Sequence, residues 1–525
     1  MRLPRFARAL FFPSLFLISL AASAELRLPK LWSDHGVIQR DHPIHVWGWA
    51  TVGEPIHVTL GRASVTLHGG NGADETASTT TDSLGHWSVY LAPRAVGGGA
   101  ITLTVNGGQA GGDVVVLHDL LIGDVWLASG QSNMEMPLLG FPGSAVLKNS
   151  AAEIAAANHP EIRLLHEPKR FSEYPLQDQD AVWQICTPET ASTFSSVAYF
   201  FAREIHEDQK VPIGVVEADW GGTPAEAWTS LDMLGTDAGL SSVFAERAAD
   251  MDTQADAQAI KARWAREDAE AKAQGRAPAQ HPWQPPVEPW QPASLYNGMI
   301  APVTPLAIRG VIWYQGEANT GLIRAPLYHR LFSAMISDWR RQFAQGDFPF
   351  LFAQISSYRS SPEEDWGMVR DAQRRTLSLR NTGMAVTIDV GDPDNVHPAD
   401  KQTVGHRLAL AARAITYGEN VHSSGPLFRQ ATTEGGGMRV YFTAADGKLA
   451  ARGGTLEGFE LAGADRHFVP AGATIDPDGA TVTVTSEHVA SPMYVRYAWP
   501  NAPDATLTDS AGLPASTFSS EVVPH

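Results

Sequence analysis

Five apolar runs in the middle of the chain constrain its fold more than any other feature. They are DVWLAS (124–129), IGVVEAD (213–219), GVIWYQ (310–315), PFLFAQI (349–355) and MAVTIDV (384–390). Near-continuous apolar runs of this length are typical of strands buried on both faces, and helical patterns lie between them. The alternation predicts an α/β domain with a parallel sheet covered by helices on both faces. Ligands in such sheets bind beyond the carboxyl ends of the strands.

The two ends of the chain have a different sequence pattern, in which short runs of alternating apolar and polar residues are separated by Gly, Asn and Asp turns. This pattern predicts β-sandwich material at both ends. We expect an N-terminal β-domain over 25–118, a central domain over 119–424 and a C-terminal β-rich domain over 425–525. Trp47, Trp49 and Trp87 of the first domain favour core packing, with a sugar-binding face as the alternative.

A charged, helix-prone stretch and a Pro-rich stretch interrupt the central domain at about 240–294. We interpret the first as a solvated helix and the second as an extended rim. Trp283 and Trp290 lie in the rim, where they either stack on sugar rings or anchor the loop.

Residues 1–24 read as a secretory signal peptide: three Arg, an apolar run from Ala9 to Leu20, and then Ala22-Ser23-Ala24. The apolar run is short for a membrane span, and no later stretch reaches about 20 apolar residues. We therefore expect an exported protein, secreted or periplasmic, with no membrane partner.

Charge and cysteine content narrow the function further. The chain carries 39 Lys and Arg against 57 Asp and Glu, a formal net charge of −18, or −21 without residues 1–24. This balance argues against nucleic acid and favours a neutral substrate. Cys186 is the only cysteine, which excludes an internal disulfide and a cysteine zinc cluster; a small buried hydrophobe is its favoured role. We predict no metal and no other cofactor, and the sequence defines no oligomeric state.

Polar groups that do not resemble packing residues follow three of the five runs. Ser132 follows the first, the segment from Gln315 to Asn319 ends the third, and Asp394 and His397 follow the fifth. Pro398, directly after His397, indicates the start of a helix. A carboxylate three residues from a histidine can fix its tautomer, and the outer ring nitrogen can then take the proton of a serine hydroxyl. We therefore predict Ser132, His397 and Asp394 as catalytic residues.

A tetrahedral intermediate requires N–H donors at the same edge of the sheet. The candidate donors are the backbone of Ser132, the backbone of Gly222 in WGGTPAEAW, and the side-chain amide of Gln315 or Asn319.

These segments resemble a known family. GDVWLASGQSNM, DWGGTPAEAW, LYNGMIAPV, GVIWYQGEANT and NVHPADKQTVGHRLA are similar to the sialate O-acetylesterase branch of the SGNH hydrolases, which includes bacterial enzymes that deacetylate plant polysaccharides such as xyloglucan. The resemblance implies a flavodoxin-like α/β/α catalytic domain with accessory, jelly-roll-like β-sandwiches and a metal-free esterase mechanism. It carries the nucleophile to Ser132 and the base to His397.

Within that resemblance the acid stays open between Asp394, Asp392, Asp389 and a dyad without an acid, and Gln315 ranks above Asn319 as the amide donor. The resulting hypothesis is an exported carbohydrate O-acetylesterase acting on an acetylated oligosaccharide or polysaccharide, or on sialate. The alternatives are a glycan-binding protein on a hydrolase-like scaffold and a serine hydrolase of lipids or peptides. Sialate would need an arginine for its carboxylate, for which Arg370 and Arg324 are the candidates.

Overall fold

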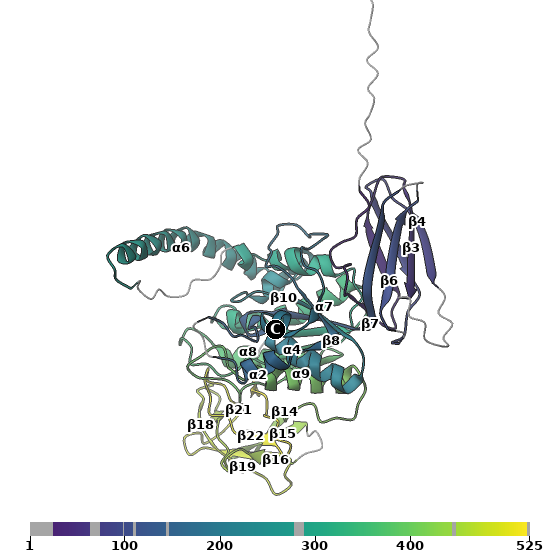
Figure 1. Ribbon diagram of the computed structural model, residues 1–525. Coiled ribbons are helices and arrows are strands. Elements are labelled where there is room, and N and C mark those ends of the chain that lie inside the picture. Colours follow the sequence, from purple (N-terminus) through teal and green to yellow (C-terminus); the bar gives the residue numbers. More distant parts are fainter. Residues whose placement is uncertain are drawn as a thin grey trace, which may run out of the picture.

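The computed structural model (Figure 1) describes residues 25–62, 74–97, 99–108, 112–142, 146–277, 288–443 and 448–521. A β-sandwich lies at one end of the molecule, the α/β domain in the middle and a second β-rich unit at the other end. The predicted signal peptide and Trp283 lie outside the described residues.

The central sheet has the order β13-β12-β11-β7-β10-β8-β9. Its strands are β7 (Val114–Gly130), β8 (His159–His166), β9 (Gln184–Cys186), β10 (Ile213–Asp219), β11 (Gly310–Tyr314), β12 (Phe350–Ala353) and β13 (Thr382–Ala385). All neighbouring pairs are parallel except β8 and β9. The chain continues from β7 to strands on both sides of it, so the carboxyl end of β7 is the switch point at which such sheets bind ligands.

The predicted α/β sheet is confirmed, with two differences in its strands. The fifth strand ends at Ala385 rather than covering 384–390, because the chain turns after Ala385. Strands β8 and β9 were not predicted: only Ile162–Leu165 of β8 is buried and this short run contains Arg163, and β9 is three residues long.

Helices pack on both faces of the sheet. Helices α4 (Ser196–Gln209) and α9 (Lys401–Ile415) pack against each other and against the sheet. On β7, Trp126 contacts Phe201 of α4 edge-on. Helix α7 (Tyr328–Phe343) packs on the other face with α8 (Trp366–Thr376), and its Trp339 contacts Trp313 of β11.

Strand β7 belongs to two sheets. Its first half pairs with β6 (Ile101–Gly107) in the N-terminal sandwich, and residues 124–130 pair with β10 in the central sheet. The predicted domain boundary at 118/119 therefore falls within one continuous strand. Strands β3 (Pro55–Arg62) and β4 (Glu75–Thr80) extend this sheet, and β2 (Ile44–Trp49) with β5 (His86–Leu91) forms the facing one. Trp87 is buried in the sandwich core, whereas Trp47 and Trp49 are half-buried.

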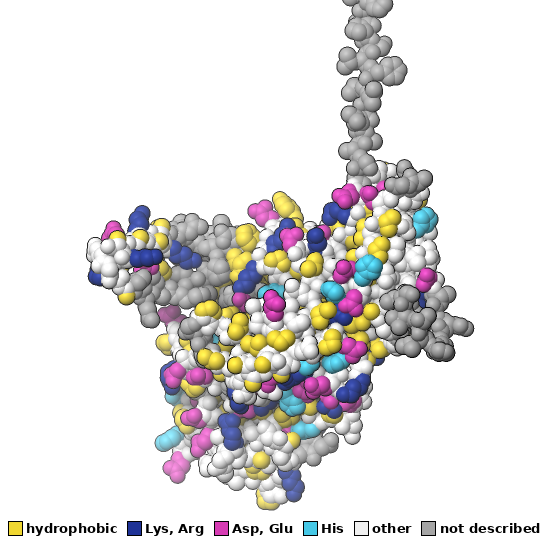
Figure 2. Space-filling view, viewed as in Figure 1, with side chains coloured by type: hydrophobic (Ala, Val, Ile, Leu, Met, Phe, Trp, Pro, Cys, Tyr) yellow, Lys and Arg dark blue, Asp and Glu magenta, His cyan; other side chains and the backbone are white. Residues whose placement is uncertain are grey.

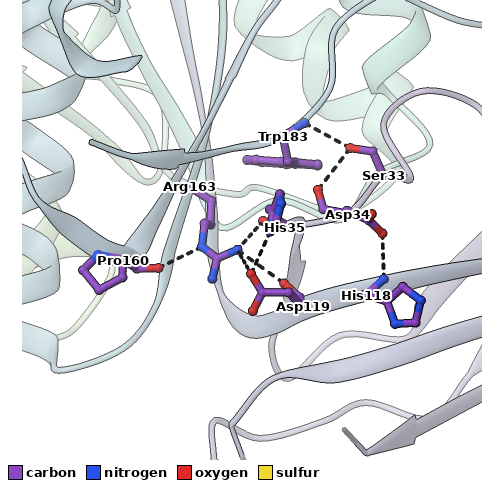
Figure 3. Close-up of polar contacts among 8 residues, drawn as sticks. All are labelled: Ser33, Asp34, His35, His118, Asp119, Pro160, Arg163 and Trp183. Atoms are coloured by element: carbon purple, nitrogen blue, oxygen red, sulfur yellow. Dashed lines mark hydrogen bonds and ion pairs between the residues drawn. The ribbon is translucent and has the colours of Figure 1, made fainter. Parts of the chain in front are cut away.

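Polar contacts lock the sandwich to the central sheet (Figure 3). The guanidinium of Arg163 on β8 donates to the Asp119 carboxylate at 2.7 Å and to the carbonyl oxygen of His35 at 3.1 Å. The His35 ring lies 2.7 Å from the same carboxylate. These bonds fix the strand that leads into the site.

The C-terminal unit is built on three small sheets. Their strands are β14 (Leu427–Glu434), β15 (Gly437–Thr443), β16 (Leu449–Ala451), β17 (Phe459–Ala462), β18 (Val469–Pro470), β19 (Gly472–Ile475), β20 (Thr481–Thr485), β21 (Tyr494–Tyr497), β22 (Leu507–Asp509) and β23 (Phe518–Ser519). Arg370 of α8 is completely buried and donates to the carbonyl oxygens of Ala498, Trp499 and Pro500, so it joins this unit to the central domain.

The interruption at 240–294 contains α6 (Ser242–Ala273), a 32-residue helix that projects from the body of the molecule (Figure 1). Figure 2 shows acidic and basic side chains interspersed over the visible face. No helix among the described residues is long and apolar enough to cross a membrane. Cys186 is buried, which raises the pKa of its thiol to about 12.

Candidate active site

The turn after β7 places Ser132 at the start of the short helix α1 (Ser132–Glu135). Gly130 makes this turn possible with a φ of +144°. A Cβ at Gly130 would lie 2.2 Å from the carbonyl oxygen of Tyr314 on the neighbouring strand β11. Only glycine fits such a close approach at that φ.

Gln131 ties the same turn to the segment that follows β11. Its backbone N–H donates to the carbonyl oxygen of Tyr314 at 3.0 Å. Its side-chain oxygen accepts the N–H groups of Gly316 at 3.3 Å and Ala318 at 3.1 Å. The loop that carries Ser132 is therefore held by three hydrogen bonds to the segment 314–318.

Ser132 and His397 are in hydrogen-bond contact, with 2.8 Å between the serine Oγ and the histidine Nε2. Phe141 packs edge-on against the imidazole, with ring centroids 5.2 Å apart. Burial, and to a smaller extent the positive charge of Lys401, lowers the pKa of His397 to about 4. The imidazole is neutral at pH 7 and can accept the serine proton.

Asp394 does not reach the imidazole. A bridge between Asp392 and Asn395 closes the loop into a tight turn, and the Asp394 side chain, which is 77% exposed, forms an ion pair with Arg359 instead. A spacing of three residues allowed contact with His397, but the turn directs the carboxylate to solvent.

The other two candidate acids are also engaged elsewhere. Asp389 forms an ion pair with Arg407 at 2.6 Å, and Asp392 accepts the backbone N–H of Asp394 at 2.9 Å. Across the described parts of the chain, no carboxylate contacts the His397 ring, so the observed unit is a Ser–His pair.

The loop after β10 passes directly beside Ser132. A Cβ on Gly221 would lie 3.2 Å from the Cβ of Ser132. The N–H of Gly221 donates to Glu135 at 2.5 Å, and Lys169 holds the other oxygen of that carboxylate at 2.6 Å. Gly222, the predicted oxyanion donor, comes directly after Gly221 in the chain and has a φ of +73°. It is therefore adjacent in sequence to a residue that lies in contact range of Ser132.

Gln315 and Asn319 form hydrogen bonds to this loop. Both are completely or almost completely buried. The side-chain N–H groups of Gln315 donate to the Thr223 carbonyl oxygen at 3.2 Å and to Asn319 Oδ1 at 2.6 Å. Asn319 Oδ1 also accepts the N–H of Ala225 at 2.9 Å. The two N–H groups of the Gln315 amide are thus already used within the protein, and the side-chain nitrogen of Asn319 donates to Glu226 at 2.9 Å. The backbone N–H groups of Ser132 and Gly222 are the remaining candidate donors.

Three residues next to the pair were not singled out from the sequence. Asn133, Glu317 and Lys401 form a hydrogen-bonded cluster, in which Asn133 and Lys401 are buried and Glu317 is half-buried. The available signal was a polar residue directly after the candidate nucleophile and a lysine four residues after the candidate base. No group of three or more His, Cys, Asp or Glu among the described residues is arranged to hold a metal ion.

Comparisons with known proteins point to one family. A family model described as carbohydrate esterase, sialic acid-specific acetylesterase, matches residues 272–414. The sialate O-acetylesterase of Rattus norvegicus is 29% identical over 96% of this chain and 96% of its own length. That of Homo sapiens is 32% identical over 73% of this chain and 69% of its own length. A solved carbohydrate acetylesterase from Xanthomonas citri is 36% identical, with a TM-score of 0.79 over 95% of this chain and 100% of its own.

Fold and comparisons together define an SGNH-type carbohydrate esterase. The chain belongs to the sialate O-acetylesterase family and is a carboxylic ester hydrolase of the carbohydrate acetylesterase class. This assignment does not support the alternative of a non-catalytic glycan-binding scaffold.

Proposed function

We propose that the chain is an exported carbohydrate O-acetylesterase in which Ser132 is the nucleophile and His397 the general base. The observation that carries the proposal is the 2.8 Å contact between Ser132 Oγ and His397 Nε2 at the carboxyl end of the central strand. A neutral imidazole in this position can activate a hydroxyl group that is otherwise a poor nucleophile.

The reaction follows from this contact. His397 Nε2 takes the proton as Ser132 Oγ attacks the acetyl carbonyl carbon, and the backbone N–H groups of Ser132 and Gly222 stabilise the negative oxygen. The C–O bond to the sugar then breaks, and His397 returns the proton to the leaving sugar oxygen. Water, deprotonated by His397, attacks the acetyl-serine and releases acetate.

A neutral acetylated sugar, as in plant polysaccharides such as xyloglucan, is the proposed substrate in preference to sialate. Sialate carries a carboxylate that requires a cationic partner. Arg370 is buried against backbone carbonyl oxygens, and Arg324 forms a 3.4 Å ion pair with Glu226 and covers the Trp290 ring. Both candidate arginines are therefore already engaged. The N-terminal signal-peptide pattern supports secretion or export to the periplasm.

The experiment measures acetate released from acetylated xyloglucan, xylan, pectin and O-acetylated sialic acid by the wild type and by Ser132→Ala. We expect release from the neutral polysaccharides, and loss of turnover on the order of 10⁶-fold in the variant, with unchanged thermal unfolding. Turnover retained by Ser132→Ala would remove Ser132 from the mechanism. Preference for O-acetylated sialic acid would reverse the substrate proposal. A second assay compares p-nitrophenyl acetate with p-nitrophenyl octanoate, and faster hydrolysis of the octanoate would indicate a lipase.

A further inference from the structure

Asn133, the residue after the nucleophile, connects three segments that surround the site. Its side-chain N–H groups donate to Glu317 at 2.5 Å and to the carbonyl oxygen of Val396 at 3.0 Å. Its side-chain oxygen accepts from the amino group of Lys401. Because Val396 directly precedes His397, Asn133 ties the loop of the base to the loop of the nucleophile.

Lys401 is the unusual member of this cluster. It is completely buried at the start of α9, and its amino group lies over the ring of Tyr314, 5.3 Å from the ring centroid. Burying an ammonium group is costly unless its hydrogen bonds and charge are compensated. Asn133 supplies a hydrogen bond, and the half-buried Glu317 supplies the nearby negative charge. Burial still lowers the pKa of Lys401 to about 7, so the amino group carries its full charge in acid. Such buried charges concentrate at functional sites.

Among the charged groups near His397, Lys401 is the one that acts on the imidazole. On the loop of the base, Asp394 pairs with Arg359, and Asp400 at the N-terminus of α9 pairs with Lys148.

On the segments packed against that loop, Glu135 pairs with Lys169, and Glu317 accepts from Asn133. Lys401 is the charged group that acts on the pKa of the imidazole, which it lowers in addition to the effect of burial.

We propose that Lys401, acting through Asn133, is the positioning residue that orients the base in this enzyme, in place of the carboxylate of a Ser-His-Asp triad. The inference rests on the proposed function of Ser132 and His397. The cluster fixes the positions of the two loops relative to each other. The ammonium charge keeps the imidazole unprotonated in acid. The imidazole is consequently a weaker proton acceptor but stays active over a wider acidic range.

The test uses Lys401→Met, which has no charge and no hydrogen-bond donor, and the double variant Lys401→Met/Glu317→Gln. The double variant leaves no uncompensated buried carboxylate and therefore protects against a simple failure to fold. Each protein is assayed with p-nitrophenyl acetate from pH 3.5 to 9, and the competent sites are counted with a serine-reactive fluorophosphonate. Lys148→Met is the matched control, because it removes an exposed lysine near the start of the same helix.

In both Lys401 variants we expect kcat per competent site to fall by about 10²-fold with little change in KM, as for a misplacement of about 1 Å. The acid limb of kcat/KM should move to higher pH, while Lys148→Met keeps the wild-type profile. If Lys401 only stabilised the fold, its replacement would lower Tm but leave kcat per competent site and the acid limb of kcat/KM unchanged. That result would overturn the inference. Failure of the proposed function is distinguishable, since Ser132→Ala would then retain turnover.

Discussion

Gly130 lies so close to Tyr314 that a Cβ on the glycine would be 2.2 Å from the tyrosine carbonyl oxygen. This contact between β7 and β11 explains why the strand can end in a turn that presents the Ser132 hydroxyl. The glycine also has a φ of +144°, which side chains of L-residues rarely adopt.

Gly130→Ala should therefore destabilise the fold and reduce esterase activity together. Strained backbone alone costs about 1–3 kcal/mol, and the clash must in addition push β7 and β11 apart. Thermal unfolding and p-nitrophenyl acetate hydrolysis measure the two effects. Gly235→Ala in α5 (Leu231–Thr236) is the matched control, because its Cβ would meet no heavy atom within 4 Å. Equal stability of the two variants would contradict the packing argument.

The pH profile of the wild type should extend far into acid. Burial and Lys401 lower the pKa of His397 to about 4, so the base stays neutral, and therefore active, as the pH falls from 7 to about 5. We expect kcat/KM to be level over this range and to fall tenfold per pH unit below about pH 4, which reports on the free enzyme. An acid limb centred near pH 6.5, the ordinary histidine value, would contradict the environment described for His397.

Asp394 should contribute little to catalysis. Its carboxylate is 77% exposed and pairs with Arg359. Asp394→Asn should keep kcat within about threefold of the wild type, whereas the loss of a true triad carboxylate costs about 10⁴-fold. Steady-state kinetics with p-nitrophenyl acetate measure the effect, and Arg359→Gln serves as the control for the loss of the ion pair. A fall of 10³-fold or more would show that Asp394 turns toward His397 during the reaction.

The sequence predicts the scaffold of this site better than its details. Buried parallel strands produce continuous apolar runs, and helices with periodic apolar residues follow them, so the sheet and the edge that carries Ser132 and His397 could be predicted. Strand β8 was missed because its buried part is only four residues long and contains Arg163.

The roles of individual polar side chains depend on contacts that spacing does not define. The spacing of Asp394 and His397 allowed a hydrogen bond, but the direction of the aspartate is set by a turn. Likewise, Gln315 ends a strand at the correct edge, yet its amide is taken by Thr223 and Asn319. Nothing in the sequence around Lys401 indicates that this lysine is completely buried.

Two buried carboxyl groups on β10 make the stability of the protein sensitive to alkaline pH. Glu217 and Asp219 are both buried, and burial is the main reason why the pKa of each is raised above the ordinary range. Both are therefore protonated in the folded state at a pH where they ionise in the unfolded chain. Since the folded state then binds more protons, stability is lost as the pH rises above the ordinary carboxyl range, by at most about 1.4 kcal/mol per pH unit and group.

Glu217→Gln should remove the part of this loss that belongs to Glu217. The amide oxygen of glutamine can still accept the N–H of Ser195, which lies 3.0 Å from the Glu217 carboxylate. We expect the variant to match the wild type in Tm near pH 4.5 and to exceed it by a few degrees at pH 8, with esterase activity retained. Calorimetry at several pH values measures the gap. A difference in Tm that does not grow with pH would mean that Glu217 is already ionised in the fold, with the His166 ring, 3.9 Å from its carboxylate, as the positive partner.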